Sequence, residues 1–265
     1  MIKTIKKFCG ATRKYLFRDT RYFFLYIYRY FQDNYKNNCN FYSDEEFVQQ
    51  IKSGRSLLRI GDGEIILLHF LPLAYEIYSD AIRNEFLKII KEYSDNSKYI
   101  LMIPLFVNYT NTAIKKRNQF RCWMPLKVTY ELIFNKKAKY FDQHIFYKDG
   151  GFERLILPYI KTKQVIIVTI KEHVEAIEKS PLASDKYLYV ISKKGNAYEA
   201  RNEIQNDIIN LIDKKGLKKE NVVILMSAGL AKTIIHDMSN MGYQLFDIGK
   251  GLESYYQGIS IQKAI

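Results

Sequence analysis

The sequence is poor in cysteine, and its cysteines form no recognisable pattern. Cys9, Cys39 and Cys122 are scattered along 265 residues, with no C-x-x-C pair. An odd, scattered set argues for a reducing compartment and against a disulfide framework or a zinc site. The four histidines form no H-E-x-x-H motif either. A chain of this length can bury about 70–75% of its unfolded surface, so it needs neither device to fold.

Other absences exclude whole classes of protein. The aromatic run at residues 22–28 is far shorter than the ~20 residues of a membrane-spanning helix. It also lacks the small-residue cleavage site of a signal peptide. No G-x-x-x-x-G-K-[ST] loop occurs, which counts against a P-loop phosphotransferase. Apolar residues make up 48% and charged residues 26%, a composition typical of a globular protein.

Positive charge is abundant and unevenly placed. The net charge is +13, and residues 1–40 hold nine Lys or Arg against two Asp, interleaved with many aromatic residues. A segment of this kind suits a helix lying in the headgroup region of an anionic membrane. A helix packed on the main domain and a nucleic-acid-binding arm remain alternatives. We treat residues 1–40 as a basic aromatic helical arm and residues 41–265 as one domain.

Strands and helices are expected to alternate along the domain. A capping box at Ser43, with Glu46 three residues later, predicts a helix start. Alternating elements of this kind predict an α/β fold with a mostly parallel sheet flanked by helices. Residues 105–138 look least regular and are interpreted as an insertion or an acceptor-facing region. The expected strands are 56–60, 99–103, 140–147, 164–169, 186–191, 221–226 and 243–248, and the expected helices are 44–52, 64–70, 80–93, 152–159, 172–179, 197–214 and 231–241.

The segment after the first of these strands is the strongest candidate site. Asp62 and Glu64 bracket Gly63, which permits a tight turn that would let both carboxylates converge. Two hard oxygen ligands form half of a Mg²⁺ or Mn²⁺ site, which a diphosphate would complete. A metal there would stabilise the charge that grows on a departing diphosphate. Arg59 could pair with the carboxylates or reach a phosphate. The alternative is a turn whose acids begin a helix and complement its dipole.

Two later turns carry weaker signals. The small residues around Ser227 and Gly229 would let a phosphate or ribose approach the backbone at a strand–helix junction. In the following glycine-containing loop, Asp247 could accept a hydrogen bond from a ribose or support the metal, and Glu253 could act as a base. An ordinary turn and a solvated loop explain these segments equally well.

Several conspicuous residues are not assigned to the chemistry. His69 and His236 lie on apolar helical stretches, where a satisfied core histidine is the expected role. Cys122 has no paired histidine in sequence and is not expected to be a nucleophile. Trp123 is either a stacking surface for a sugar ring or an ordinary core anchor.

Taken together, these motifs resemble a known family. Residues 56–64, ending in Arg59-Ile60-Gly61-Asp62-Gly63-Glu64, resemble the R-F-G-D-G-E signature of the GT-D-type glycosyltransferases, formerly known only as a domain of unknown function. Residues 242–249 resemble the family's G-Y-x-x-x-D-I-G segment, and residues 194–198 its central S-K-N-A-F. The likeness covers residues 43–257. It departs from the family pattern at residues 227–230, at residues 171–174 and after Gly249, where Lys250 and Gly251 stand in place of a histidine and an acid.

The resemblance implies a Rossmann-like α/β domain, a divalent cation and a UDP-sugar donor, with glucose as the default sugar. It implies Asp62, Glu64 and Glu253 as catalytic residues, Asp62 and Glu64 also being the metal ligands. The implied donor-binding residues are Arg59, Gly61, Gly63, Asn196, Ser227, Gly229, Asp247 and Lys250. The acceptor would be a glycan on a lipid or protein carrier in surface polysaccharide or glycoprotein synthesis. A cytoplasmic enzyme at the inner leaflet of the membrane would give the basic arm a role.

Two other functions stay open from the sequence. One is another metal-dependent nucleotide enzyme, such as a phosphotransferase. The other is a catalytically silent nucleotide- or glycan-binding scaffold of a glycan-assembly complex. Specific nucleic-acid binding is not expected, because it rests only on charge and most of the charge excess lies in one arm.

Overall fold

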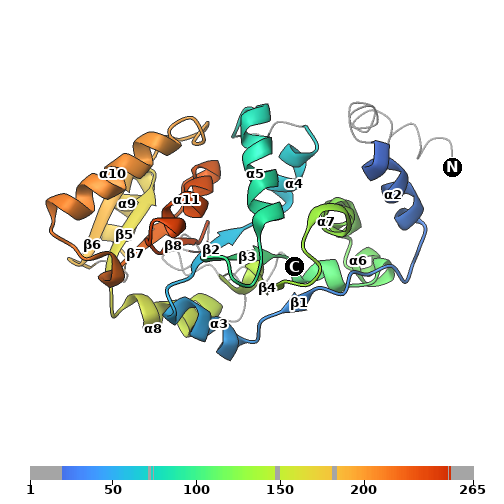
Figure 1. The fold of residues 1–265 in the computed structure, drawn as a ribbon, viewed down its shortest axis with the longest axis horizontal. Helices are drawn as coiled ribbons and strands as arrows, with labels where there is room; N and C mark the ends of the chain where they lie inside the picture. The colour runs from blue at the N-terminus through green and yellow to red at the C-terminus, as the bar shows by residue number, and fades with distance from the viewer. Residues whose placement is uncertain are drawn as a thin grey trace.

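The computed structural model describes residues 20–70, 73, 75–146, 150–180, 184–249 and 251. An eight-stranded sheet in the order β1-β4-β3-β2-β8-β7-β5-β6 forms its centre (Figure 1). Every strand pair in it is parallel. The predicted α/β class is therefore confirmed. The strands are β1 (Asn40–Phe41), β2 (Ser56–Arg59), β3 (Tyr99–Ile103), β4 (Lys139–Asp142), β5 (Gln164–Thr169), β6 (Tyr187–Ile191), β7 (Val222–Met226) and β8 (Leu245–Asp247).

Helices cover both faces of the sheet and bury two hydrophobic clusters against it. The central strands β3 and β7 are buried along their whole length, which is why they read as continuous apolar runs. One face carries α4 (Asp62–Leu68), α5 (Asp80–Glu92), α7 (Phe120–Ile133), α10 (Arg201–Lys214) and α11 (Ile234–Asn240). The other carries α3 (Asp44–Lys52), the π-helical turn η3 (Phe152–Ile156), α8 (Leu157–Ile160) and α9 (Lys171–Glu178).

Local sequence signals located most of these elements. Ser43 caps α3 as predicted: its side chain accepts from the Glu46 amide at 3.2 Å, and Glu46 Oε2 accepts from the Ser43 amide at 2.9 Å. Short 3₁₀ turns fill several junctions between the expected elements. They are η1 (Leu105–Asn108), η2 (Gln143–Phe146), η4 (Lys219–Asn221) and η5 (Gly229–Thr233).

The interpretation of residues 105–138 as irregular is wrong. The segment folds into η1, α6 (Asn111–Lys116) and α7. Helix α7 is covered on two sides, since Leu126 and Tyr130 join the cluster on the sheet while Met124 and Val128 join a third cluster. A helix that is apolar on both sides shows no clear helical period, which hid it in the sequence.

That third cluster is formed with the N-terminal segment. Helix α2 (Thr20–Tyr30) packs beside α7 through Tyr22 and Tyr26 (Figure 1). Its opposite side exposes Phe24 and Tyr28, at 71% and 61%, and Phe31 directly after the helix is 76% exposed. The described part of the basic arm is thus packed on the domain and still presents an aromatic face.

Polar contacts join the same segment to α7. The Lys127 ammonium is fully buried and donates to the carbonyl oxygens of Tyr35 and Tyr109 and to Asn111 Oδ1, at 2.7, 2.7 and 2.8 Å. Glu131 accepts from Arg29 and from the Tyr35 hydroxyl. Among the described helices, none combines the length and apolar composition that crossing a bilayer requires.

Candidate functional site

The carboxyl ends of β2, β8 and β7 are neighbours and bring three distant segments together. In parallel α/β sheets this edge is where ligands bind. Gly61 is the N-cap of α4, two residues after β2, and its amide donates to Glu64 Oε2 at 2.7 Å. Asp247 ends β8, and its Oδ2 accepts from the Arg59 amide at 3.2 Å. The turn η5 that follows β7 supplies Lys232.

Lys232 is the centre of this cluster. Its ammonium lies 2.7 Å from Glu64 Oε1 and 3.1 Å from Asp247 Oδ2. The Arg59 side chain closes the other side of Asp247, with Nε 3.2 Å from Oδ1. Glu64, Lys232 and Asp247 are exposed by only 5%, 5% and 3%. Such a buried set is held together because each charge faces an opposite one.

The pKa shifts follow from this pairing. Burial by itself would lower the pKa of Lys232, but Asp247 and Glu64 outweigh it and hold that pKa above its usual value. Burial would raise the pKa of Asp247, but Arg59 and Lys232 hold it below its usual value. Both groups are therefore charged near neutral pH.

Asp62 differs from Glu64, although the two stand side by side in the motif. Asp62 is exposed at the start of α4, and its Oδ1 accepts from the Gly63 amide at 2.9 Å. Both oxygens of Glu64 face partners of their own, the Gly61 amide and Lys232. The two carboxylates therefore do not converge as expected: Asp62 is exposed, whereas Glu64 is buried. The helix-start alternative also describes them, since both acids lie in the first turn of α4.

This donor set fits a divalent cation at Asp62 better than at Glu64. Asp62 offers an open carboxylate, whereas a cation at Glu64 Oε1 would have to displace the Lys232 ammonium. Mg²⁺ commonly binds through one or two carboxylates, together with substrate phosphates and water. In the described part of the chain, no group of three or more His, Cys, Asp or Glu side chains could by itself hold a metal.

The turns after β7 and β8 are joined next to the cluster. The Ser227 hydroxyl donates to the Gly249 carbonyl oxygen at 2.8 Å, and the Gly249 amide donates to Met226. Gly249 has φ +47°, and a Cβ there would lie 1.8 Å from Arg59 Nη2. Glycine at this position is what allows the Arg59 guanidinium to lie against the loop.

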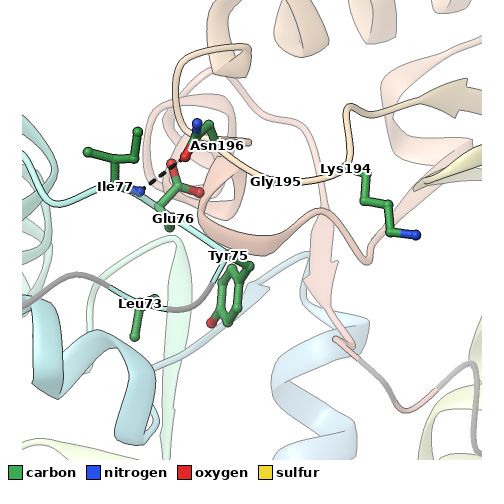
Figure 2. Close-up of a pocket in the computed structure, with 7 residues that line it drawn as sticks. All are labelled: Leu73, Tyr75, Glu76, Ile77, Lys194, Gly195 and Asn196. Atoms are coloured by element: carbon green, nitrogen blue, oxygen red, sulfur yellow. Dashed lines mark hydrogen bonds between the residues drawn. The ribbon is translucent and has the colours of Figure 1, made fainter.

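The structure also contains a cleft of about 380 Å³. Residues 75–77 and 194–196 line it and are tied together (Figure 2). The Asn196 amide donates to the Tyr75 carbonyl oxygen at 2.9 Å, and Asn196 Oδ1 accepts from the Ile77 amide at 3.1 Å. Residues 75–77 thus form a short strap, which Asn196 holds through its side-chain oxygen. The backbone of Asn196 is left-handed, at φ +46°.

Tyr75 connects the cleft with the acid cluster. In Figure 2 its ring points away from Asn196. Its hydroxyl lies 3.1 Å from the place where a Cβ on Gly63 would stand, and its ring approaches Gly229. Burial, followed by the charge of Glu64, raises the pKa of Tyr75 to about 12. The Tyr75 hydroxyl is therefore uncharged near neutral pH, and it lies close to the turn that carries Asp62.

A second polar group lies where β4 ends. Asp142 Oδ1 is 3.2 Å from His144 Nδ1 and also accepts from the amides of Leu105 and His144, each at 3.2 Å. Phe106 and Trp123 pack against the His144 ring at centroid distances of 5.3 and 5.5 Å. The predicted strand 140–147 stops at Asp142 because that side chain bonds the amides that would continue the sheet.

Sequence reasoning missed Lys232, Tyr75 and His144. Lys232 is a single lysine inside the apolar segment 230–235, and such a charge in an otherwise buried stretch was the available signal. His69 and His236 are buried, as expected of core histidines. The assigned residues Lys250 and Glu253 lie outside the described part of the chain, as does the side chain of Cys122.

Comparison with known proteins agrees with this fold. Two similar solved structures are "A New Glycosyltransferase (DUF1792) from Streptococcus sanguinis" and "The highly conserved domain of unknown function 1792 has a distinct glycosyltransferase fold". Each is 20% identical, with TM-scores of 0.65 and 0.62; they match 84% of this chain and 87% and 83% of their own chains. No curated protein matches.

The fold thus defines a protein of the GT-D glycosyltransferase architecture. The family model "Glycosyltransferase GT-D fold" matches residues 57–260, and the chain belongs to that family. The resemblance seen in the sequence is confirmed.

Proposed function

We propose that this glycosyltransferase moves a sugar from a UDP-sugar, glucose being the first candidate, to a glycan acceptor on a lipid or protein carrier. The pathway would be the synthesis of a surface polysaccharide or glycoprotein. The observation that supports this proposal is the exposed Asp62 beside the buried Glu64–Lys232–Asp247 cluster, at the ligand-binding edge of the sheet.

In this proposal Asp62 holds a Mn²⁺ or Mg²⁺ ion together with the donor phosphates. Glu64 joins as a ligand only where Lys232 withdraws from Oε1. When bound, the cation stabilises charge on the departing diphosphate. The turns at Gly61–Gly63 and Ser227–Gly229 receive the nucleotide. Arg59 and Lys232 keep Asp247 ionised and in place beside them.

Other donor contacts are proposed from the family pattern. Asn196 would act on the donor through the strap that it holds at residues 75–77. Lys250 is proposed as a phosphate contact from its position after the D-I-G segment alone, and the same family pattern offers Glu253 as one candidate for the base.

Calorimetric UDP binding with and without Mn²⁺ tests this proposal. We expect Asp62→Asn to weaken metal-dependent binding at least tenfold while leaving the melting temperature unchanged, because Asp62 is exposed. Glu64→Gln should weaken binding and lower the melting temperature together, because Glu64 faces Lys232 inside the protein.

Asp80→Asn is the matched control, since Asp80 begins α5 as Asp62 begins α4. If UDP bound equally well with and without Mn²⁺, and equally well to the wild type and to Asp62→Asn, the assignment would be contradicted. Metal-dependent UDP binding without release of UDP from any UDP-sugar would favour the scaffold function instead.

We further propose that the enzyme is cytoplasmic and rests on the inner face of an anionic membrane. Phe24 and Tyr28 lie on the exposed side of α2, and Phe31, directly after the helix, is exposed as well. Residues 1–19, which carry six Lys or Arg against one Asp, precede that helix directly. Aromatic residues combined with cations suit an anionic headgroup region.

Flotation with vesicles that contain or lack phosphatidylglycerol tests the membrane proposal. Phe24→Ser/Phe31→Ser should reduce binding to anionic vesicles at least tenfold. Ile77→Ser/Ile191→Ser removes exposed apolar residues elsewhere and serves as control. Equal flotation of the two double variants would contradict the proposal. Removing all of residues 1–40 is a poorer test, because it also uncovers α7 and Lys127.

A further inference from the structure

The His144–Asp142 pair lies in the same row of the sheet as the Asp62 turn. Ile103 pairs with Asp142, and the Ile60 amide donates to the Met102 carbonyl oxygen as β2 and β3 run on in register. Ile60, Ile103 and Asp142 therefore stand side by side on three adjacent strands. Asp62 and His144 each follow two residues beyond this row.

Two strand spacings separate these two positions, which amounts to about 10 Å. The intervening side chain is Gln143, which lies 3.2 Å from where a Cβ on Gly61 would stand. In inverting glycosidases the two acting carboxyl groups stand roughly 6.5–9.5 Å apart, on opposite sides of the sugar.

The His144 ring is oriented from one side only. Asp142 holds Nδ1, and two backbone amides in turn hold Asp142 Oδ1. Among the described residues no side chain bonds Nε2, so this nitrogen can take a proton. A carboxylate on Nδ1 fixes the ring and stabilises the imidazolium that then forms.

The surroundings of His144 suit a sugar. Its described contacts besides Asp142 are the rings of Phe106 and Trp123, neither of which titrates. Trp123 is half-buried and stands at 90° to the His144 ring. An aromatic wall next to a proton acceptor is an arrangement that can bind a sugar and activate its hydroxyl.

A second histidine with carboxylate partners, His236, differs from His144 in the hydrogen bonding of its ring nitrogens. His236 has Asp237 on Nδ1 at 2.7 Å and Glu92 on Nε2 at 3.2 Å, so both ring nitrogens are engaged. It packs against Tyr99, at the amino end of β3, which is the opposite edge of the sheet. Only the pair at β4 combines a free Nε2 with the ligand-binding edge among the described histidine–carboxylate pairs.

We infer that His144, positioned by Asp142, accepts the proton of the attacking hydroxyl, and that transfer inverts the anomeric configuration. The inference rests on the proposed function. The hydroxyl oxygen bonds to the anomeric carbon and its proton passes to Nε2 of His144. The bond from that carbon to the diphosphate oxygen breaks, and its electron pair leaves with UDP. Direct displacement requires the proton acceptor and the leaving group to lie on opposite sides of the sugar, so this assignment implies inversion.

Release of UDP from UDP-glucose, with water as acceptor, provides the assay. His144→Gln should lower kcat by about 10²- to 10⁴-fold, the usual contribution of a positioned base. The dissociation constant of UDP should stay within about twofold. Imidazole in solution should restore part of the activity of His144→Ala, which repair of a structural defect would not do. Asp142→Asn should lower kcat less, and His236→Gln should leave it unchanged.

The outcomes separate this inference from the proposed function. A kcat of His144→Gln within threefold of the wild type, or release of the sugar with retained configuration in an initial NMR spectrum, overturns the assignment alone. A wild type that releases no UDP from any UDP-sugar overturns the proposed function, and this assignment with it.

Discussion

Lys232 places one ammonium between two carboxylates from opposite ends of the chain, 2.7 Å from Glu64 and 3.1 Å from Asp247. The contact joins the turn after β2 to β8, the last strand in the sequence and the neighbour of β2 in the sheet. It fixes the D-x-E turn to the rest of the edge through charge, in a region where all three side chains are buried. Stability and site geometry therefore depend on the same three residues.

Lys232→Met should cost about 3–5 kcal/mol in free energy of unfolding, because it leaves buried carboxylates without their cation. Adding Glu64→Gln should recover part of that loss. Urea unfolding of the single and double variants measures both effects, with exposed Lys214→Met as control. Strictly additive losses would show that the two side chains are not coupled.

Gly249→Ala should displace the Arg59 guanidinium, since a Cβ would lie 1.8 Å from Nη2. We expect weaker UDP binding together with a loss of about 1–3 kcal/mol in stability. Gly242→Ala separates the two causes: its φ is +86° but no atom lies within 4 Å of the added Cβ, so it reports backbone strain alone. Equal UDP affinity in both variants would exclude a role for the Arg59 position.

Lys127→Met should destabilise the packing of residues 20–40 on α7. It leaves the Tyr35 and Tyr109 carbonyl oxygens and Asn111 Oδ1 without their donor. Unsatisfied buried acceptors cost about 1–3 kcal/mol each, so a total of at least about 3 kcal/mol is expected for the three. Lys115→Met, which removes an exposed pair with Asp33, should cost less than about 1 kcal/mol. A denaturant midpoint for each variant decides between these values.

His69 should make the protein sensitive to acid. Burial lowers its pKa to about 3, and its Nε2 lies 2.7 Å from the Thr129 hydroxyl, which itself donates to Pro125. Because the unfolded chain binds the proton at about pH 6.5 and the folded one does not, stability falls as pH drops from 6.5 toward 3. The full penalty is on the order of 5 kcal/mol.

His69→Gln should flatten that part of the stability–pH curve while keeping an N–H for Thr129. Urea unfolding at several pH values between 3 and 7 measures the slope. His173→Gln, at a half-buried position, is the comparison. Identical slopes for wild type and His69→Gln would show that other groups govern acid unfolding.

Short-range sequence patterns predicted much of the fold. The Ser43 capping box and the β-branched run at residues 164–169 act within a few residues, and both formed as expected. Helix α7 was not predicted, because one of its buried faces packs against α2, about a hundred residues earlier in the chain. A period in the sequence reports one buried face, so a helix that is buried on two faces gives no such period.

The site was predictable only in part, for a related reason. The turn at residues 59–64 is continuous in sequence, and its glycines and acids could be recognised together. The meeting of Glu64, Lys232 and Asp247 depends on the strand order β2-β8-β7, which no local pattern encodes. The role of Glu64 as an internal partner followed from that order, and the place of His144 two strands away from the Asp62 turn followed from the order β4-β3-β2.

The packing of α2 also has a consequence for synthesis on the ribosome. Arg29 and Tyr35 find their partner Glu131 102 and 96 residues further along the chain. At about 5–20 residues per second, that delay lasts roughly 5–20 s. During this interval the most aromatic and basic part of the chain has been made while the helix that covers it has not. The nascent chain therefore presents Tyr22 and Tyr26 as well as Phe24 and Phe31, and its first encounters, with a chaperone or a lipid surface, take place before the domain exists.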